Sequence, residues 1–547
     1  MEVGRVWLLV LMLILATAAK KPDPVREAVA TFDQKAFLEN IRTLASDEFE
    51  GRSPGTRGEE LTIKFLAKKF AEVGASAGNP DGTYFQKVPL VGYTIDTGAS
   101  LKLIGSRGEL SLKFADDYVA WTRRLVEEVQ MQGEVVFVGY GVQAPEYGWD
   151  DYKGLDVKGK VLLMLINDPQ VPDERLFGGK AMTYYGRWTY KYEIAAKLGA
   201  AGAIIIHETG PAGYGWNVVR NGREREQFTI DSGNKNLGLC PVEGWITYEK
   251  AEALFKLAGK DLAEAKRAAL ERNFRPLALE VKAELLLKNK LRYVDSHNVI
   301  AKVEGSDPKL RNEYVIYVAH WDHFGIGGSG ADRIYNGAVD NATGTAALLE
   351  LAKAFSKARP KRSVLFLAVT AEERGLLGSA YYAEHPLYPH NKTLAVINID
   401  SMNVYGRTKD VVVIGLGASS LDDYVRAAAR LQDRVVKPDP EPEKGYYYRS
   451  DHFSFAKHGV PAVYAESGID YVDKPKGYGM QVRERYVSQD YHQPSDEVRE
   501  DWDLSGAMQD IELLFRVGYE VANAKRMPTW RPKSEFRAIR EASLRGK

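Results

Sequence analysis

Residues 314–323 of the chain read YVIYVAHWDH, an apolar run that ends in polar side chains. Residues 363–373 (SVLFLAVTAEE) and 394–400 (LAVINID) repeat this pattern. Apolar runs of this length that alternate with helical patterns are typical of parallel strands buried on both faces. We therefore predict an α/β fold, in which a mixed and mostly parallel sheet is covered by helices on both faces.

Polar side chains follow these predicted strands, and a parallel sheet brings the carboxyl ends of its strands to one edge. Two imidazoles and three carboxylates in such positions suit a pair of zinc or related divalent ions. The candidate ligands are His320, Asp340, Glu373, Asp400 and His492. Five ligands fill two sites only if one carboxylate bridges. We predict Asp340 as the bridge, because it follows a glycine loop and precedes a predicted helix over 341–356.

The charges of this set predict a hydrolytic centre. A hydroxide shared by two divalent ions balances their charge against that of three carboxylates, and such a water is acidified towards neutral pH. Glu372 adjoins a candidate ligand without being needed as one, so it can serve as general base and pass a proton to a leaving amine. Asp322, two residues after His320, is placed to orient that imidazole.

These residues resemble the co-catalytic di-zinc exopeptidase family, which includes bacterial leucyl aminopeptidases and glutamate carboxypeptidase II. The resemblance covers residues 31–95 and 291–525 and implies a zinc exopeptidase fold with two Zn²⁺ per chain. The roles that it implies are His320 and Asp400 on one zinc, Glu373 and His492 on the other, Asp340 as the bridge and Glu372 as general base.

Between residues 96 and 290 the pattern changes to short β-rich runs separated by turn residues. Gly139–Val142, Trp149–Tyr152 and Val157–Val161 resemble segments of the protease-associated domain, which is often inserted in such enzymes. We therefore predict an inserted β-rich α+β domain over 96–290. The basic tail at 526–547 is expected to wrap the surface or fray.

Several residues near the predicted centre are candidates for substrate contact. The resemblance suggests Tyr491 as a catalytic donor to the oxyanion of a tetrahedral intermediate, and a packed tyrosine is the alternative. The other candidates are His452, Arg449 and Tyr448. The aromatic residues around Tyr448 suit a peptide groove and packing between two domains equally well. His323 is interpreted as structural.

The N-terminal segment has the pattern of a secretory signal peptide over residues 1–19. Arg5 precedes an apolar run over 6–15, and small residues allow cleavage near Ala18 or Ala19. The run is shorter than the about 20 residues of a membrane span, and an uncleaved anchor is the alternative. We predict export to a bacterial periplasm or the medium, without stable membrane insertion after cleavage.

Composition excludes several classes of protein. The chain has 74 basic and 74 acidic residues, and this zero net charge argues against a general nucleic-acid-binding protein. Its one cysteine, Cys240, excludes an intramolecular disulfide and a cysteine-ligated metal. The resemblance to exopeptidases implies peptides as the partners, and the sequence leaves the oligomeric state open.

Together these features predict an exported zinc exopeptidase that removes the N-terminal residue of peptides, using a metal-bridged hydroxide and Glu372. One alternative is a carboxypeptidase or dipeptidase of the same family, in which Arg449 would bind a carboxylate. A single-zinc glutaminyl cyclase is a second alternative, and the complete ligand set disfavours it. A third is a peptide-binding protein without activity, which the presence of Glu372 disfavours.

Overall fold

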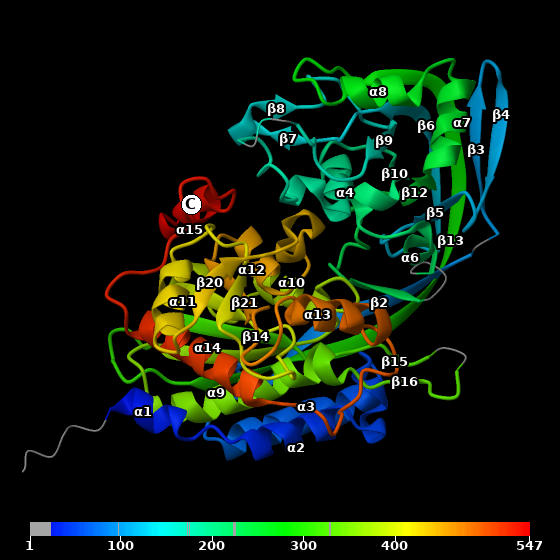
Figure 1. The fold of residues 1–547 in the computed structure, drawn as a ribbon. Coiled ribbons are helices and arrows are strands. Elements are labelled where there is room, and N and C mark those ends of the chain that lie inside the picture. The colour runs from blue at the N-terminus through cyan, green and yellow to red at the C-terminus, as the bar shows by residue number, and fades with distance from the viewer. Residues whose placement is uncertain are drawn as a thin grey trace, which may run out of the picture.

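The computed structural model describes residues 23–96, 98–171, 173, 175–221, 226–327 and 330–546. The predicted signal peptide lies outside these described residues. Within them, no helix has both the length and the apolar character that crossing a membrane requires. The described chain forms two large sheets with their helices, which lie one above the other in Figure 1, and two small two-stranded sheets.

The first sheet has a parallel centre between antiparallel strands. Its strand order is β11 (Gln227–Ile230), β2 (Phe85–Ile95), β13 (Leu277–Val303), β17 (Ser363–Val369), β14 (Tyr314–His320), β18 (Thr393–Asn398), β21 (Ala462–Ser467), β19 (Asp410–Ile414) and β20 (Val435–Pro438). Strands β17, β14, β18 and β21 run parallel. The mixed, largely parallel sheet predicted from the apolar runs is therefore confirmed.

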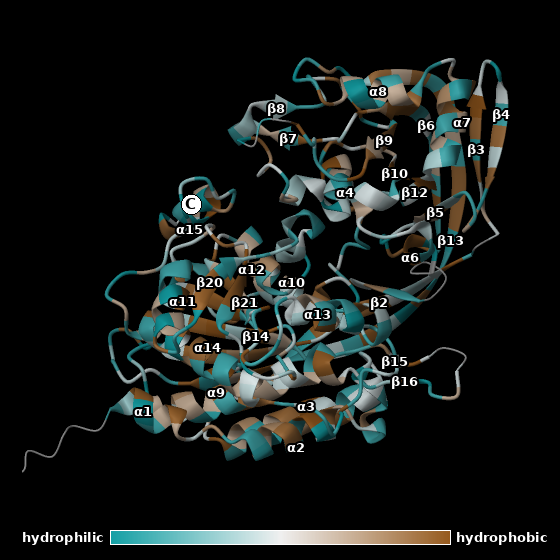
Figure 2. Cartoon of the chain, viewed as in Figure 1, coloured by the Kyte–Doolittle hydropathy of each residue, from teal (hydrophilic) through white to brown (hydrophobic). Residues whose placement is uncertain are grey.

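Helices cover both faces of this sheet, as predicted. One face carries α1 (Pro24–Val29), α2 (Gln34–Leu44), α3 (Arg57–Glu72), α9 (Gly344–Ala358), α11 (Leu421–Arg430) and α14 (Ser505–Asn523). The other face carries α10 (Leu377–Glu384), α12 (His452–Lys457) and part of the C-terminal segment. Successive strand residues point to opposite faces: Val315 joins the first cluster and Ile316 the second. Figure 2 shows apolar residues gathered between these helices and the strands.

The C-terminal segment after α14 packs against the second face of the sheet. Trp530 and Phe536 are buried there, and the indole N–H of Trp530 donates to the carbonyl of Gly459 at 2.8 Å. Helix α15 (Arg537–Leu544) follows, and its Arg540 donates to backbone carbonyls of residues 390 and 393. The segment therefore wraps the surface.

The second sheet lies in the segment predicted as an insert. Its strand order is β4 (Gly108–Lys113), β3 (Ser100–Gly105), β13, β6 (Glu128–Phe137), β9 (Val161–Leu165), β10 (Gly202–His207), β12 (Glu243–Thr247) and β5 (Tyr118–Trp121). Strands β6, β9, β10 and β12 are parallel. Helices α4 (Trp188–Lys197), α7 (Tyr248–Leu257) and α8 (Leu262–Ala268) pack onto this sheet.

The 27-residue strand β13 belongs to both sheets. Its first part pairs with β6 and β3 of the second sheet, and residues 289–299 pair with β2 of the first. Ile95 at the end of β2 lies opposite Asn289, so the chain leaves the first sheet and re-enters it at neighbouring positions. Strand β11 of the intervening segment also pairs with β2. The segment 96–290 therefore contributes an edge strand to the first sheet.

Candidate metal centre

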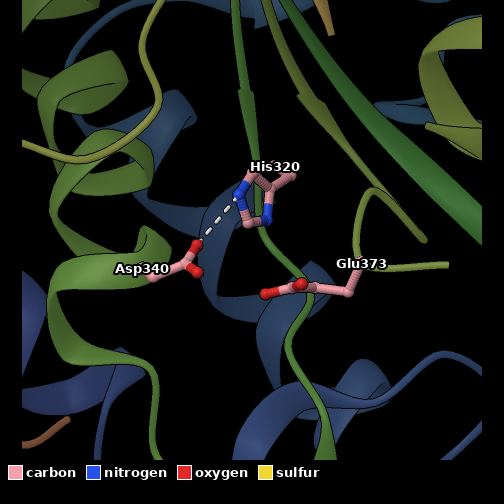
Figure 3. A group of neighbouring side chains, drawn as sticks. All are labelled: His320, Asp340 and Glu373. Carbon is pink, nitrogen blue, oxygen red and sulfur yellow. Dashed lines mark ion pairs between the residues drawn. The ribbon is translucent and has the colours of Figure 1, made fainter. Parts of the chain in front are cut away.

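The structure brings the five predicted ligands together at the carboxyl edge of the first sheet. His320 ends β14, Asp400 comes two residues after β18, and Asp340 lies in the turn before α9. Glu373 follows β17, and His492 follows helix α13 (Tyr478–Gln489). Figure 3 shows His320, Asp340 and Glu373 converging from three separate elements. One ligand atom from each of these three residues lies within 4.8 Å of the others.

Asp340 lies between the two histidines. Its Oδ1 is 3.2 Å from Nε2 of His320, and its Oδ2 is 3.3 Å from Nε2 of His492. Nε2 of His320 also faces Oδ1 of Asp400 at 3.3 Å, and Nε2 of His492 faces Oε2 of Glu373 at 3.1 Å. The five side chains therefore form two groups that share one carboxylate.

An irregular turn presents Asp340. Residues 338–343 form a π-type turn in which Asp340 (φ −106°, ψ 94°) and Asn341 (φ −134°, ψ 41°) leave helical geometry. The side-chain oxygen of Asn341 accepts from the N–H groups of Gly344 and Ser401, each at 2.9 Å. Gly337 has φ +54°, and a Cβ there would collide with the imidazole of His323. The start of α9 is thus tied to the loop that carries Asp400.

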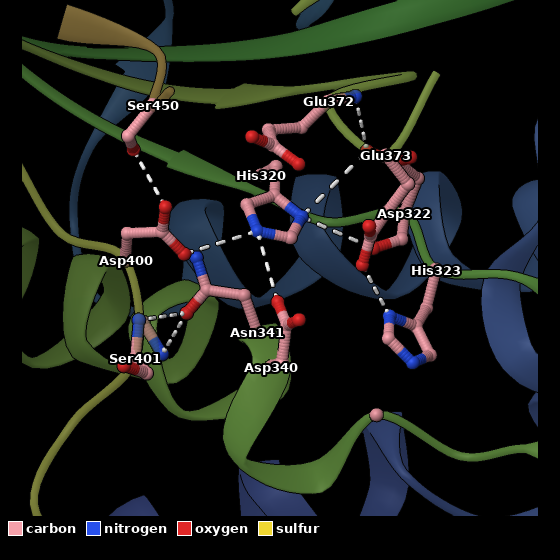
Figure 4. A network of polar contacts seen from close by, with 12 residues as sticks. His320, Asp322, His323, Asp340, Asn341, Glu372, Glu373, Asp400, Ser401 and Ser450 are labelled. Atoms are coloured by element: carbon pink, nitrogen blue, oxygen red, sulfur yellow. Dashed lines mark hydrogen bonds and ion pairs between the residues drawn. The ribbon is translucent and has the colours of Figure 1, made fainter. Parts of the chain in front are cut away.

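Asp322 and Glu372 lie beside His320; in Figure 4, Glu372 is above the imidazole and Asp322 is to its right. The fully buried carboxylate of Asp322 accepts the backbone N–H of Glu372 at 3.0 Å, and its Oδ1 is 3.8 Å from Nδ1 of His320. Burial raises the pKa of Asp322 to about 7, and the charge of His320 opposes this rise. Burial also raises the pKa of Glu372 well above its ordinary value. A carboxyl group with a raised pKa suits proton transfer near neutral pH.

Two further residues hold candidate ligands. The hydroxyl of Ser450 donates to Oδ2 of Asp400 at 2.6 Å, which leaves Oδ1 facing His320. Nδ1 of His323 lies 2.6 Å from Oε1 of Glu373. Sequence reasoning assigned no role to Ser450 and interpreted His323 as structural. The sequence did contain one indication for His323, which lies with His320 in the polar end of the apolar run 314–323.

Part of the chain matches a known protein family. The sequence model described as Peptidase family M28 matches residues 298–515. Residues 298–515 belong to peptidase family M28. All five candidate ligands and Glu372 fall inside this M28 domain.

Relatives of the M28 domain include aminopeptidases. Aminopeptidase NAALADL1 of Rattus norvegicus is 25% identical over 426 residues, which cover 67% of this chain and 53% of the relative. Leucine aminopeptidase 2 of Trichophyton equinum is 27% identical over 253 residues, covering 44% and 48%. The chain thus spans about half the length of these curated relatives. Among solved structures, the aminopeptidase from Aneurinibacillus sp. strain AM-1 has a TM-score of 0.51 at 20% identity, covering 92% of this chain and 97% of that one. This last likeness shows a shared fold.

Two of the four predicted substrate-contact residues are exposed beside the M28 centre. The ring of Tyr491 stacks on the imidazole of His492, with centroids 3.7 Å apart, and is 36% exposed. Arg449 is exposed, and its guanidinium lies 5.5 Å from the ring centroid of Tyr446. Both side chains are therefore accessible to solvent.

The predicted substrate contact is wrong for His452, and for Tyr448 the structure selects one of the two alternatives. His452 is fully buried between Tyr447 and Tyr464, at ring distances of 4.7 and 5.4 Å, and burial lowers its pKa to about 3. It therefore packs in the core of the M28 domain, away from solvent. The hydroxyl of Tyr448 donates to Glu535 at 3.1 Å, and its ring lies 6.2 Å from that of Tyr184 in the insert. For Tyr448, the structure shows packing against the segment 96–290.

The segment 96–290, predicted as an insert, also reaches the loop that carries Glu372 and Glu373. The guanidinium of Arg374 lies 5.8 Å from the ring of Phe228, on strand β11 of the insert. It lies 5.2 Å from the ring of Phe324, whose own ring is 4.7 Å from the imidazole of His492. The cation of Arg374 thus lies between two aromatic rings, and the second ring, that of Phe324, meets His492 edge to face.

Proposed function

We propose that this protein is an exported zinc-dependent aminopeptidase that holds two Zn²⁺ and hydrolyses the N-terminal residue of peptides. The observation that carries the proposal is the position of Asp340, whose two carboxylate oxygens face His320 and His492 separately. One such carboxylate between two groups of ligands is the arrangement that a pair of divalent ions requires.

The donor set fits two divalent cations. Asp340 and Glu373 are nearly inaccessible to solvent, with 8% and 3% of their side chains exposed, and Asp400 retains 22%. Within the part of the chain that the structure describes, no lysine or arginine forms an ion pair with these three carboxylates. Buried carboxylates without a cation are costly, and nitrogen and oxygen donors in this number suit Zn²⁺.

In the proposed grouping, His320 and Asp400 hold one ion, Glu373 and His492 hold the other, and Asp340 contacts both. When bound, a pair of zinc ions supplies Lewis acidity for the peptide carbonyl and lowers the pKa of a shared water. The backbone carbonyl of Asp322, 3.2 Å from Nδ1 of His320, and the hydroxyl of Ser450 are the groups proposed to orient His320 and Asp400.

Glu372 is the proposed general base. Its carboxylate points towards the cluster from the loop after β17 (Figure 4), and its raised pKa favours holding a proton between the two halves of the reaction. It takes a proton from the attacking water and gives it to the leaving amine. Tyr491, on the open side of the centre, is the proposed donor to the oxyanion of the tetrahedral intermediate.

An aminopeptidase is favoured over a carboxypeptidase by the names of the relatives, both of which are aminopeptidases. Arg449 is the feature that favours the alternative, because an exposed guanidinium beside the centre is able to bind a substrate carboxylate. The two groups of ligands around Asp340 support a two-ion enzyme over a single-zinc cyclase. We further propose export by the signal peptide at 1–19 and a protease-associated domain at 96–290.

The test is metal analysis followed by a peptide panel. The purified mature protein should contain two divalent ions per chain, and chelation should abolish hydrolysis until Zn²⁺ is restored. Among matched peptides, blocking the amino terminus should stop cleavage, whereas blocking the carboxyl terminus should not. The opposite pattern identifies a carboxypeptidase. One tightly bound ion together with cyclisation of N-terminal glutamine overturns the proposal.

A further inference from the structure

Arg52 and Asp496 are two buried charged residues outside the proposed ligand set. Both form hydrogen bonds to the loop that carries Asp340. Arg52 ends the turn Asp47–Arg52 between α2 and α3 and is 1% exposed. Asp496 follows His492 along the chain and is 2% exposed. Sequence reasoning gave neither residue a role, because one lies nearly 270 positions before the first predicted ligand and the other in a loop.

Every guanidinium nitrogen of Arg52 donates to a backbone carbonyl. Nη1 donates to Asn336 and Nη2 to Gly337, at 2.6 and 2.9 Å. Nε donates to Trp321 at 2.8 Å, and Nη1 also donates to Leu44 at 2.6 Å. The rigid planar fork of arginine therefore joins the loop before Asp340 to the end of β14.

Asp496 holds the same loop from the other side. Its Oδ1 accepts the N–H of Val339 and its Oδ2 accepts the N–H of Asp340, both at 3.0 Å. Its backbone carbonyl accepts the N–H of Ala338 at 2.9 Å. The hydroxyl of Tyr486 also donates to Oδ2, at 3.2 Å. Arg52 thus binds carbonyl groups of the loop, and Asp496 binds N–H groups of the same loop. Two buried side chains of opposite charge therefore hold the loop that carries Asp340.

We propose that Arg52 and Asp496 are positioning residues that fix Asp340 in its metal-binding orientation before any ion binds. The inference rests on the proposed metal centre and extends it to two residues that contact neither ion. A ligand whose backbone is already held loses less freedom when it binds, so the pair should raise metal affinity.

The charge of Arg52 supports the same role. Burial lowers its pKa to about 10, and the carboxylates of Asp322, Asp496 and Asp340 oppose this fall, so the group stays cationic at neutral pH. A buried cation near these carboxylates offsets their mutual repulsion while no metal is bound.

The competing explanation is that Arg52 and Asp496 only stabilise the fold. Arg540 provides a matched control for this explanation. Arg540 is 3% exposed and donates to the backbone carbonyls of His390 and Thr393, each at 2.7 Å. It has the same chemistry as Arg52, but it lies on α15, and neither of its partners adjoins a candidate ligand, whereas Trp321 adjoins His320 and Gly337 lies in the loop before Asp340. A lysine at either position keeps the charge and loses the planar set of donors.

The experiment compares the full-length wild type with Arg52→Lys, Asp496→Asn and Arg540→Lys. Each metal-free protein is first checked by circular dichroism and thermal unfolding. Co²⁺ is then titrated while its visible absorption reports coordination, and Zn²⁺ affinity is measured against a chromophoric chelator. We expect Arg52→Lys and Asp496→Asn to weaken binding of at least one ion by about 10- to 100-fold, as for other residues that orient ligands. Arg540→Lys should change affinity by less than about twofold, whatever its effect on unfolding.

The inference is overturned if folded Arg52→Lys and Asp496→Asn bind Co²⁺ and Zn²⁺ with wild-type affinity and spectrum. It is also overturned if Arg540→Lys weakens binding as much as they do, because the effect would then follow stability alone. If Arg52→Lys does not fold, Asp496→Asn decides. A wild type that binds neither ion refutes the metal centre itself, which is a separate result.

Discussion

The imidazole of His323 directly contacts Glu373, with Nδ1 2.6 Å from Oε1. The other oxygen of Glu373 faces His492 at 3.1 Å, so the contact leaves one carboxylate oxygen available to the centre. A residue that follows the strand carrying His320 therefore orients a proposed ligand on a different loop.

Replacing His323 with alanine should weaken metal binding, because Glu373 would lose the partner that holds Oε1. We expect a loss of about 10- to 100-fold in Zn²⁺ affinity, measured by competition with a chelator. His458→Ala is the control, since that ring stacks on His390, with centroids 5.1 Å apart, and touches no proposed ligand. Equal affinity in both variants would leave His323 with a packing role.

Glu372→Gln should separate proton transfer from metal binding. Glutamine keeps the volume and removes the proton-accepting charge, so both ions should remain while kcat falls by about 10²- to 10⁴-fold with little change in KM. Glu373→Gln should instead weaken or remove one ion. Metal analysis and steady-state kinetics on both variants check this. Loss of metal in Glu372→Gln alone would mean that the two adjacent roles are reversed.

Tyr491→Phe tests the proposed oxyanion donor. The ring that stacks on His492 is retained and only the hydroxyl is removed. Loss of one such donor costs about 10²- to 10³-fold in kcat, so we expect a fall of this size with metal content unchanged. A variant with wild-type kcat would show that Tyr491 serves only to pack against His492.

Phe228→Ala tests whether the insert influences the centre. Phe228 stacks on Arg374, which adjoins Glu373 in sequence. A cation–π contact contributes about 0.5–2 kcal/mol, so kcat/KM should fall by roughly twofold to thirtyfold with both ions retained. Tyr293→Ala, at a 66% exposed position on strand β13, which β2 separates from β11, is the control. If kcat/KM is the same in the two variants, the contact between Phe228 and Arg374 does not influence the centre.

Cys240 should report unfolding of the insert. The thiol is 1% exposed, and burial raises its pKa to about 12. The thiolate is the reactive form, so the folded protein should resist iodoacetamide at pH 8 and the unfolded chain should react. Mass spectrometry with and without denaturant measures the difference. Rapid labelling of the native protein would contradict the buried position.

The sequence by itself determined the sheet and the proposed centre to a large extent. His320, Glu372 and Asp400 each follow an apolar run, and a parallel sheet must bring the ends of such runs to one edge. Local order along the chain was therefore enough to predict which side chains meet. The same reasoning placed Asp322 beside His320, because the two residues belong to one strand end.

Other features depended on contacts between distant segments, about which local patterns carry no information. Arg52 meets the loop before Asp340 only because the turn between α2 and α3 packs beneath it. His452 resembled a pocket residue in its local sequence, yet the rings of Tyr447 and Tyr464 enclose it. The sequence also did not predict that strand β13 belongs to two sheets, because its alternating pattern does not show which strands it pairs with. Long-range packing decides burial and partners, whereas periodicity along the chain decides the elements themselves.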